Sequence, residues 1–182
     1  MRPLHIPALA LVIAMLAGCS DDPEPLFADP SPSETAQPTA EPSTAEPEPE
    51  PWEENSPDGA IAFVEHWIDT FNESNKTGDI EVLDQLSHPR CQTCNSFMSL
   101  TEEVYKSGGR IQGRGWDLKK PTYTSPDDGK NVAIAGVMSI PKQSIFRENE
   151  EMRSPAINRR YTFQLEWNAG AWTTRAILKE AS

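Results

Sequence analysis

Residues 161–178 read YTFQLEWNAGAWTTRAIL, and this stretch decides the fold class. Up to Trp167 it alternates aromatic residues or Leu with Thr, Gln and Glu, which is typical of a strand with one face in a core. Residues 168–171 predict a hairpin loop, and residues 172–179 predict a strand that returns antiparallel. One face of this returning strand is expected to carry Trp172, Thr174, Ala176 and Leu178. An antiparallel sheet is therefore expected at the C-terminal end.

Two further strands are predicted upstream of this hairpin. Residues 132–140 are nearly continuously apolar, which indicates a central strand with both faces covered. Residues 127–130 predict the turn before it, and an earlier strand begins near Trp116 but is disrupted by Pro121. Residues 147–154 are strongly charged and are expected to form a mobile loop. The sheet should thus contain about four strands.

Three helices are predicted before the sheet. Ser56-Pro57-Asp58 is a typical helix start, and the helix should end at Gly78 in the left-handed conformation. Its apolar residues recur at three- and four-residue spacing: Ala60, Phe63, Val64, Trp67, Ile68 and Phe71. A short helix should follow before His88, and a third should run from about residue 91 to 106. Three N-terminal helices followed by a curved antiparallel sheet make an α+β fold.

The charge of the chain is concentrated in one segment. The formal net charge is −12, and residues 20–58 hold 12 acidic residues, no Lys or Arg, and 10 of the 17 prolines. The remaining residues 59–182 carry 16 acidic and 15 basic residues. A segment so rich in Pro and Glu cannot bury enough apolar surface to fold, so a disordered acidic linker is expected. No basic patch stands out, which excludes a typical nucleic-acid-binding protein.

The N-terminus predicts export and a lipid anchor. Residues 1–18 carry a short positive segment and an apolar run that is too short to span a bilayer. Leu16-Ala17-Gly18-Cys19 resembles a bacterial lipobox, which implies that Cys19 receives a diacylglycerol and becomes the first residue. The expected organisation is a signal peptide (1–18), a lipidated Cys and linker (19–57) and one α+β domain (58–182). The expected location is the extracytoplasmic face of the cell membrane.

The order of elements resembles the nuclear-transport-factor-2-like cone, in which a curved sheet wraps a long N-terminal helix. The lipobox, the acidic tail, Ser-Pro-Asp-Gly-Ala at residues 56–60, Cys-Gln-Thr-Cys at 91–94 and Gly108-Gly109 are together similar to a family of actinobacterial lipoproteins with a domain of unknown function. This resemblance implies an envelope location. It implies no activity and no catalytic residues.

Cys91 and Cys94 form the most specific motif in the chain. In an exported protein the first interpretation is a structural disulfide. A thiol–disulfide exchange site is the alternative, since a CxxC at a helix N-terminus lowers a thiol pKa. A zinc site with His88 is a third interpretation, but it lacks a fourth ligand because Cys19 is assigned to lipid.

Other residues give weaker signals for chemistry. His66 is the obvious candidate base for a pocket between helix and sheet, but no second acid can be assigned to it. Trp67, Trp116 and Phe163 are expected either to line a pocket or to fill the core. Residues 108–115 hold glycines and arginines, and they predict a helix cap and a bulged edge strand rather than an anion site. No metal and no cofactor is expected.

The functional prediction is a membrane-anchored envelope lipoprotein whose domain is a non-enzymatic module for a small ligand or an envelope protein. The alternatives are an enzyme with an acid or base in the cone pocket and, less favoured, a CxxC thiol oxidoreductase. The sequence alone does not identify a ligand.

Overall fold

The computed structural model describes residues 48–125, 131–148 and 150–180, which belong to one compact unit, Ala45–Ser182. The predicted signal peptide, the lipobox with Cys19, most of the linker and the turn at 127–130 lie outside these described residues. Within the described ranges, none of the helices is both long and apolar enough to cross a membrane.

The three predicted helices are present. α1 spans Pro57–Thr77, α2 spans Glu81–Gln85 and α3 spans Gln92–Lys106. The Ser56 hydroxyl accepts a hydrogen bond from the Gly59 N–H at the start of α1. Gly78 ends the helix with φ 83°, a conformation that glycine adopts without steric cost. A short 3₁₀ helix, η1 (Pro51–Glu53), precedes them.

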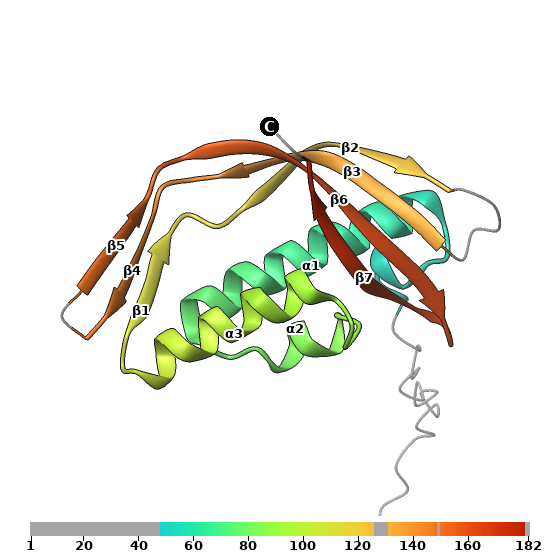
Figure 1. Ribbon diagram of the computed structural model, residues 1–182. Helices are drawn as coiled ribbons and strands as arrows, with labels where there is room; N and C mark the ends of the chain where they lie inside the picture. Colours follow the sequence, from blue (N-terminus) through green and yellow to red (C-terminus); the bar gives the residue numbers. More distant parts are fainter. Residues whose placement is uncertain (1–47, 126–130, 149, 181–182) are drawn as a thin grey trace, which may run out of the picture. The chain divides into compact units, whose positions relative to one another are not determined.

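A four-stranded antiparallel sheet lies over the helices in the order β2-β3-β6-β7. Its strands are β2 (Asp117–Thr124), β3 (Asn131–Ile140), β6 (Ile157–Asn168) and β7 (Ala171–Lys179). β3 is central, as predicted, and pairs with β6 from Asn131↔Glu166 to Ile140↔Ile157. Figure 1 shows all three helices on one side of this sheet.

A second sheet contains β1 (Arg110–Gly113), β4 (Gln143–Arg147) and β5 (Glu150–Ser154) in the order β1-β4-β5. We call these three strands the wing; in Figure 1 it continues the curved sheet beyond the four-stranded part. The prediction of one sheet of about four strands is therefore imprecise: the described residues form seven strands in two sheets. The expected mobile loop at residues 147–154 is mostly the β4–β5 hairpin, in which Arg147 pairs with Glu150 and Ile145 with Met152. Opposite charges across the pair stabilise it.

The predicted disruption at Pro121 is a bulge rather than a break. β2 runs through Pro121, with a register shift between Lys119 and Thr122 and φ 52° at Lys120. β2 is an edge strand, where a residue without an N–H is tolerated. The strand therefore stays paired with β3 on both sides of the bulge.

A second bulge changes the predicted inward face of β7. Gln164 pairs with Ala176 and Leu165 with Thr174, so Arg175 is an extra residue on β7. Beyond it the alternation is reversed: Ile177 is 4% exposed and Leu178 is 49% exposed. Trp172 and Thr174 share the buried face, whereas the prediction that Ala176 and Leu178 lie on that same face is wrong.

The start of the domain lies earlier than the predicted residue 58. Residues 50–56, which we call the strap, pack on α1 and on β7. The Trp52 ring stacks on His66 with centroids 4.1 Å apart, and Trp172 Nε1 donates to the Glu54 carbonyl at 2.8 Å. Trp52 thus gives the end of the linker an apolar side chain that can be buried.

Asn72 on α1 fixes the helix to the start of β2. Its Nδ2 donates to the Trp116 carbonyl at 2.9 Å, and its Oδ1 accepts from the Trp116 N–H at 2.6 Å. A Cβ at Gly115 would lie 2.8 Å from the Asn72 side chain, so a glycine there lets the two segments approach. One amide therefore satisfies both backbone groups of Trp116.

Candidate functional site

The space between α1 and the sheet is filled by aromatic rings. Trp67 and Phe163 are each 1% exposed and meet edge to face at 5.6 Å. Trp116 packs on Phe71 at 4.8 Å and on Phe97 at 5.3 Å. Of the two interpretations of Trp67, Trp116 and Phe163, the structure favours core: all three belong to the core cluster or pack against it.

His66 does not face the space between helix and sheet. Its ring lies parallel to Trp52 of the strap, with an interplanar angle of 4°. Partial burial there lowers the pKa of His66, while the carboxylates of Asp69 and Glu50 act in the opposite direction. Its surroundings are those of a packing contact, and the proposal of a pocket base at this position is not supported.

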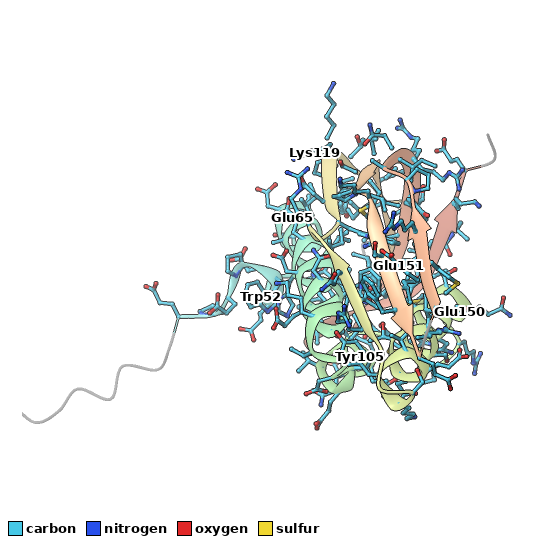
Figure 2. The ribbon with its side chains drawn as sticks, turned by 90° about the vertical axis from the view of Figure 1, so that its left-hand side faces the viewer. Trp52, Glu65, Tyr105, Lys119, Glu150 and Glu151 are labelled. Carbon is cyan, nitrogen blue, oxygen red and sulfur yellow. A yellow bond between two sulfur atoms is a disulfide. The ribbon has the colours of Figure 1, made fainter. Side chains whose placement is uncertain are left out.

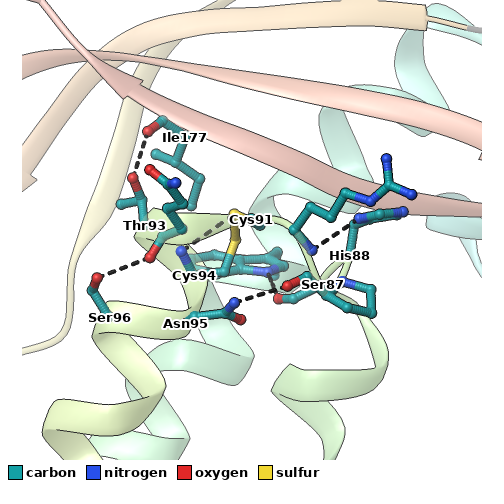
Figure 3. Close-up of a disulfide and its surroundings, with 12 residues drawn as sticks. Ser87, His88, Cys91, Thr93, Cys94, Asn95, Ser96 and Ile177 are labelled. Atoms are coloured by element: carbon teal, nitrogen blue, oxygen red, sulfur yellow. Dashed lines mark hydrogen bonds between the residues drawn. A yellow bond between two sulfur atoms is a disulfide. The ribbon is translucent and has the colours of Figure 1, made fainter.

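Cys91 and Cys94 form the predicted disulfide, shown in Figure 3. Cys91 is the N-cap residue of α3, and its Sγ accepts a hydrogen bond from the Cys94 N–H at 3.2 Å. Both residues are 0% exposed. Thiol–disulfide exchange requires a thiolate to reach a sulfur atom. A buried bridge does not meet that requirement, and bridged sulfurs are not zinc ligands.

The disulfide belongs to a network that joins the loop before α3 to β7. The His88 N–H donates to the Thr174 carbonyl at 2.9 Å, and Thr93 Oγ1 donates to the Ile177 carbonyl at 2.9 Å. Trp67 Nε1 donates to Ser87 Oγ at 2.9 Å. His88 Nδ1 accepts from the Arg90 N–H, so this histidine caps the loop. The role of the bridge is structural.

The wing presents a polar surface on its outer side. Its register aligns Arg110, Phe146 and Glu151 in one row and Gln112, Ser144 and Arg153 in the next. Arg147 of β4 faces the helices, because its Nη1 pairs with Glu103 of α3 at 3.1 Å. Side chains alternate along a strand, so every second residue of the wing faces the helices. The two rows therefore lie on the outer face of the wing, where Figure 2 shows Glu151.

An open hollow of about 530 Å³ lies on this outer face. We call it the wing hollow; its lining comes from all three strands and from the turn before β4: Gln112, Gly113, Lys142, Gln143, Ser144, Glu151, Arg153 and Ser154. The lining offers amides, hydroxyls, an ammonium and a guanidinium. Lys142 and Arg153 are positively charged and Glu151 is negatively charged, so the lining has a net charge of +1.

The charges beside the wing hollow make contacts with one another and with a ring. Arg153 donates to both oxygens of Glu151, at 2.8 and 2.7 Å. The pKa of Glu151 is lowered, first by the hydrogen bond from Arg153 and then by that from Ser144. The Arg110 guanidinium lies 4.0 Å from the centroid of the Phe146 ring. These contacts orient the polar groups before any ligand arrives.

A second open hollow of about 520 Å³ lies between the end of α3 and the β4–β5 hairpin, lined by Glu103, Ser107, Arg147, Glu148 and Glu150. Its acidic side chains do not form a metal site: within the described residues, no group of three or more His, Cys, Asp or Glu side chains is placed to hold a metal ion.

Sequence reasoning missed the wing hollow because it assigned half of the wing to a loop. The signal that would have revealed it is the period-two pattern of Gln143–Arg147, in which Ile145 and Ser144 point to opposite faces. The Pro residues at 141 and 155, which bound the hairpin, are a second signal.

Among solved structures, the chain is similar to the intermembrane space region of the chloroplast protein ARC6, with a TM-score of 0.54 and 13% identity over 70% of this chain and 98% of that one. A putative scytalone dehydratase from Novosphingobium aromaticivorans has a TM-score of 0.47 and 9% identity, over 68% and 85% of the two chains. A putative polyketide cyclase from Xanthomonas campestris has a TM-score of 0.40 and 15% identity, over 71% and 93%.

The likeness to the ARC6 region concerns the fold alone. Three helices followed by curved antiparallel sheets are consistent with the cone that the sequence predicted. A comparison with curated proteins found no matching sequence. Residues 33–177, which include nearly the whole described domain, match a family of unknown function. The chain therefore belongs to the family DUF6318.

Proposed function

We propose that this chain is an envelope lipoprotein whose domain is a non-enzymatic binding module, held at the extracytoplasmic face of the membrane through Cys19. The wing hollow is its ligand site. The observation that carries this proposal is the contrast between two surfaces: rings fill the interior of the cone, whereas the outer face of the wing carries an open hollow lined by oriented polar groups.

The lining of the wing hollow favours a ligand rich in hydrogen-bond acceptors. Lys142 and Arg153 supply charged donors, Gln112 supplies a neutral one, and Glu151 is already engaged by Arg153 and Ser144. An acidic or polyhydroxylated small molecule, such as an envelope glycan fragment, matches this donor set. The volume of about 530 Å³ lies within the roughly 300–1,000 Å³ that is usual for small-molecule sites.

The ligand site is tested by NMR titration of the chain with acidic and neutral glycan fragments. Binding that shifts the amide signals of Gln112, Ser144 and Arg153, and that is weakened about tenfold by Lys142→Ala, supports the proposal. Lys106→Ala is the matched control, because Lys106 is an exposed lysine on α3. Titrations that leave the wing signals unchanged for every fragment would reject this hollow as the site.

The anchor is tested separately from the ligand site. Cys19→Ala should move the chain from the membrane fraction to the soluble fraction, because stable membrane attachment requires the acyl chains. A Cys19→Ala chain that remains with the membrane would disprove the lipid anchor and would leave the ligand-site test unaffected.

A further inference from the structure

A third open hollow lies at the β7 edge of the four-stranded sheet. Its volume is about 490 Å³, and its lining comes from the loop before α3 and from β3, β6 and β7. We call it the arginine hollow; its polar lining residues are Arg90, Asn131, Gln164 and Arg175. It shares no lining residue with the wing hollow, so it is separate from the proposed ligand site.

The bulge on β7 adds one of the two arginines to this hollow. Arg175 is the extra residue between Thr174 and Ala176. Thr174 is buried, so the alternation of the strand points Arg175 away from the core. Next to it, Gln164 pairs with Ala133 on one side and with Ala176 on the other. Alanine side chains are short, which leaves an open space beside the Arg175 guanidinium.

The loop before α3 brings the second arginine to the same place. β7 lies at one end of the strand order, and Ser87 forms a parallel bridge with Thr174 along its free edge. The His88 N–H donates to the Thr174 carbonyl, and the Thr174 N–H donates to the Leu86 carbonyl. The Arg90 N–H donates in turn to His88 Nδ1 at 3.1 Å. These contacts hold Arg90 beside the bulge that follows Thr174.

The charges of the arginine hollow are not neutralised by its own lining. Two of the described lining residues are arginines and none is acidic, which gives the lining a net charge of +2. No hydrogen bond or ion pair within the described ranges involves the Arg90 guanidinium. Arg175 pairs with Glu166, but at 3.6 Å, which is longer than a hydrogen bond. Like charges repel each other, so an anion between the two arginines would be stabilised.

We infer that the arginine hollow binds a phosphate monoester. A guanidinium donates two parallel N–H bonds to a pair of oxygens. A carboxylate has two oxygens and one negative charge, so a single arginine satisfies it. A phosphate monoester has three terminal oxygens and a charge of about −1.5 to −2 at pH 7, which matches two guanidiniums. The side-chain amide of Gln164 can donate to a remaining lone pair.

The size of the arginine hollow favours an organic ester over the bare ion. A volume of about 490 Å³ lies within the roughly 300–1,000 Å³ that is usual for small-molecule sites. Val132, Ala133 and Leu165 add apolar surface for the organic part. The ester has two chemical sources, a soluble sugar phosphate or the head group of a lipid such as phosphatidic acid. This inference does not rest on the proposed function of the wing hollow.

The test is isothermal titration calorimetry with glucose 6-phosphate on residues 20–182, which contain the whole compact unit. Binding should be saturable. Arg90→Gln and Arg175→Gln should each raise the dissociation constant at least about tenfold, because each removes a charge-assisted contact with the phosphate. Arg175→Lys keeps the charge but loses the planar fork, so it should weaken binding less than Arg175→Gln.

Two other arginines provide matched controls. Arg160 is half exposed on the same sheet but does not line the arginine hollow, and Arg153 lines the wing hollow. Arg160→Gln and Arg153→Gln remove the same charge and should change the dissociation constant less than about twofold at about 0.15 M salt. Circular dichroism should show an intact fold for every variant, since all four arginines are exposed.

Vesicles distinguish the two sources of the phosphate. If the ligand is a lipid head group, the chain should sediment with phosphatidylcholine vesicles that contain phosphatidic acid and not with pure phosphatidylcholine, and Arg90→Gln should abolish this sedimentation. If the ligand is a soluble ester, glucose 6-phosphate should bind more tightly than inorganic phosphate, and the chain should stay in the supernatant with both kinds of vesicle.

Three results would overturn the inference. Neither glucose 6-phosphate nor inorganic phosphate could bind at up to about 10 mM, and the chain could ignore both kinds of vesicle. Acetate could bind as tightly as inorganic phosphate, which would assign the site to carboxylates. Finally, binding could persist unchanged in the double variant Arg90→Gln, Arg175→Gln, which would place the phosphate elsewhere on the chain.

Discussion

Gly59→Ala gives a sharp test of the strap, because in this structure the substitution should destabilise the fold, whereas it usually stabilises a helix. Gly59 lies in the first turn of α1 and is buried. A glycine replaced by alanine in a helix normally stabilises it by about 0.5–1 kcal/mol. Here the new Cβ would overlap the carbonyl oxygen of Glu54, which is a backbone atom of the strap.

The cost of moving Glu54 follows from the contacts of the strap. The hydrogen bond from Trp172 Nε1 to the Glu54 carbonyl contributes about 1 kcal/mol. The stacking of Trp52 on His66 contributes a further ~0.5–1.5 kcal/mol. Subtracting the stabilisation that alanine gives a helix leaves a net decrease of about 1 kcal/mol in the free energy of unfolding. This should lower the melting temperature by about 3–5 °C in a domain of this size.

The measurement is thermal and urea unfolding of Gly59→Ala in two chains, one beginning at Ser20 and one beginning at Asn55. The longer chain contains the complete strap, and the shorter one lacks Trp52 and Glu54. In the shorter chain the substitution should stabilise the domain by about 0.5–1 kcal/mol, since nothing opposes the new methyl group. The reasoning is refuted if Gly59→Ala stabilises both chains, or destabilises both by the same amount.

Three further predictions concern stability. Replacing Cys91 and Cys94 by Ser should lower the free energy of unfolding by about 2 kcal/mol, measured by urea unfolding, because the closed loop is short. The folded state lowers the pKa of His66, so the unfolded chain binds more protons than the folded one near this pKa. The free energy of unfolding should therefore fall as the pH drops from about 7.5 to about 5.5. His66→Phe should reduce this pH dependence, measured by unfolding curves at both pH values. Asn72→Ala should lower the free energy of unfolding by about 2–3 kcal/mol, because it leaves both backbone groups of Trp116 unpaired. The control Asn95→Ala removes one exposed hydrogen bond and should lower it by under about 1 kcal/mol in the same assay.

The sequence predicted the parts of the fold in which burial sets the periodicity. The apolar stripe of α1 and the alternation of residues 161–167 are visible because the core removes those side chains from water. The disulfide was also predictable, since its two cysteines are close in sequence. In each case the residues that decide the structure are neighbours along the chain.

The features that the sequence did not reveal depend on distant partners. The wing is exposed on both faces along β5, so its strands carry charges, and opposite charges across the hairpin replace the apolar signal. The bulge at Arg175 depends on how β7 aligns with β6, and no local residue marks it. His66 was a candidate base for a pocket between helix and sheet, and its contact with Trp52 was not predicted because Trp52 lies in a segment expected to be a linker.

The strap also determines how the domain responds to mechanical force. A pull applied through the residues before Glu50 would reach the Trp52–His66 stack and the Trp172–Glu54 hydrogen bond before it reached the first turn of α1. Without these contacts, tension would peel the helix open from Ser56 one turn at a time. With them, the initial load passes to β7, whose ladder with β6 resists shear through many hydrogen bonds at once. The strap would thus take the first load before the helices of the domain do.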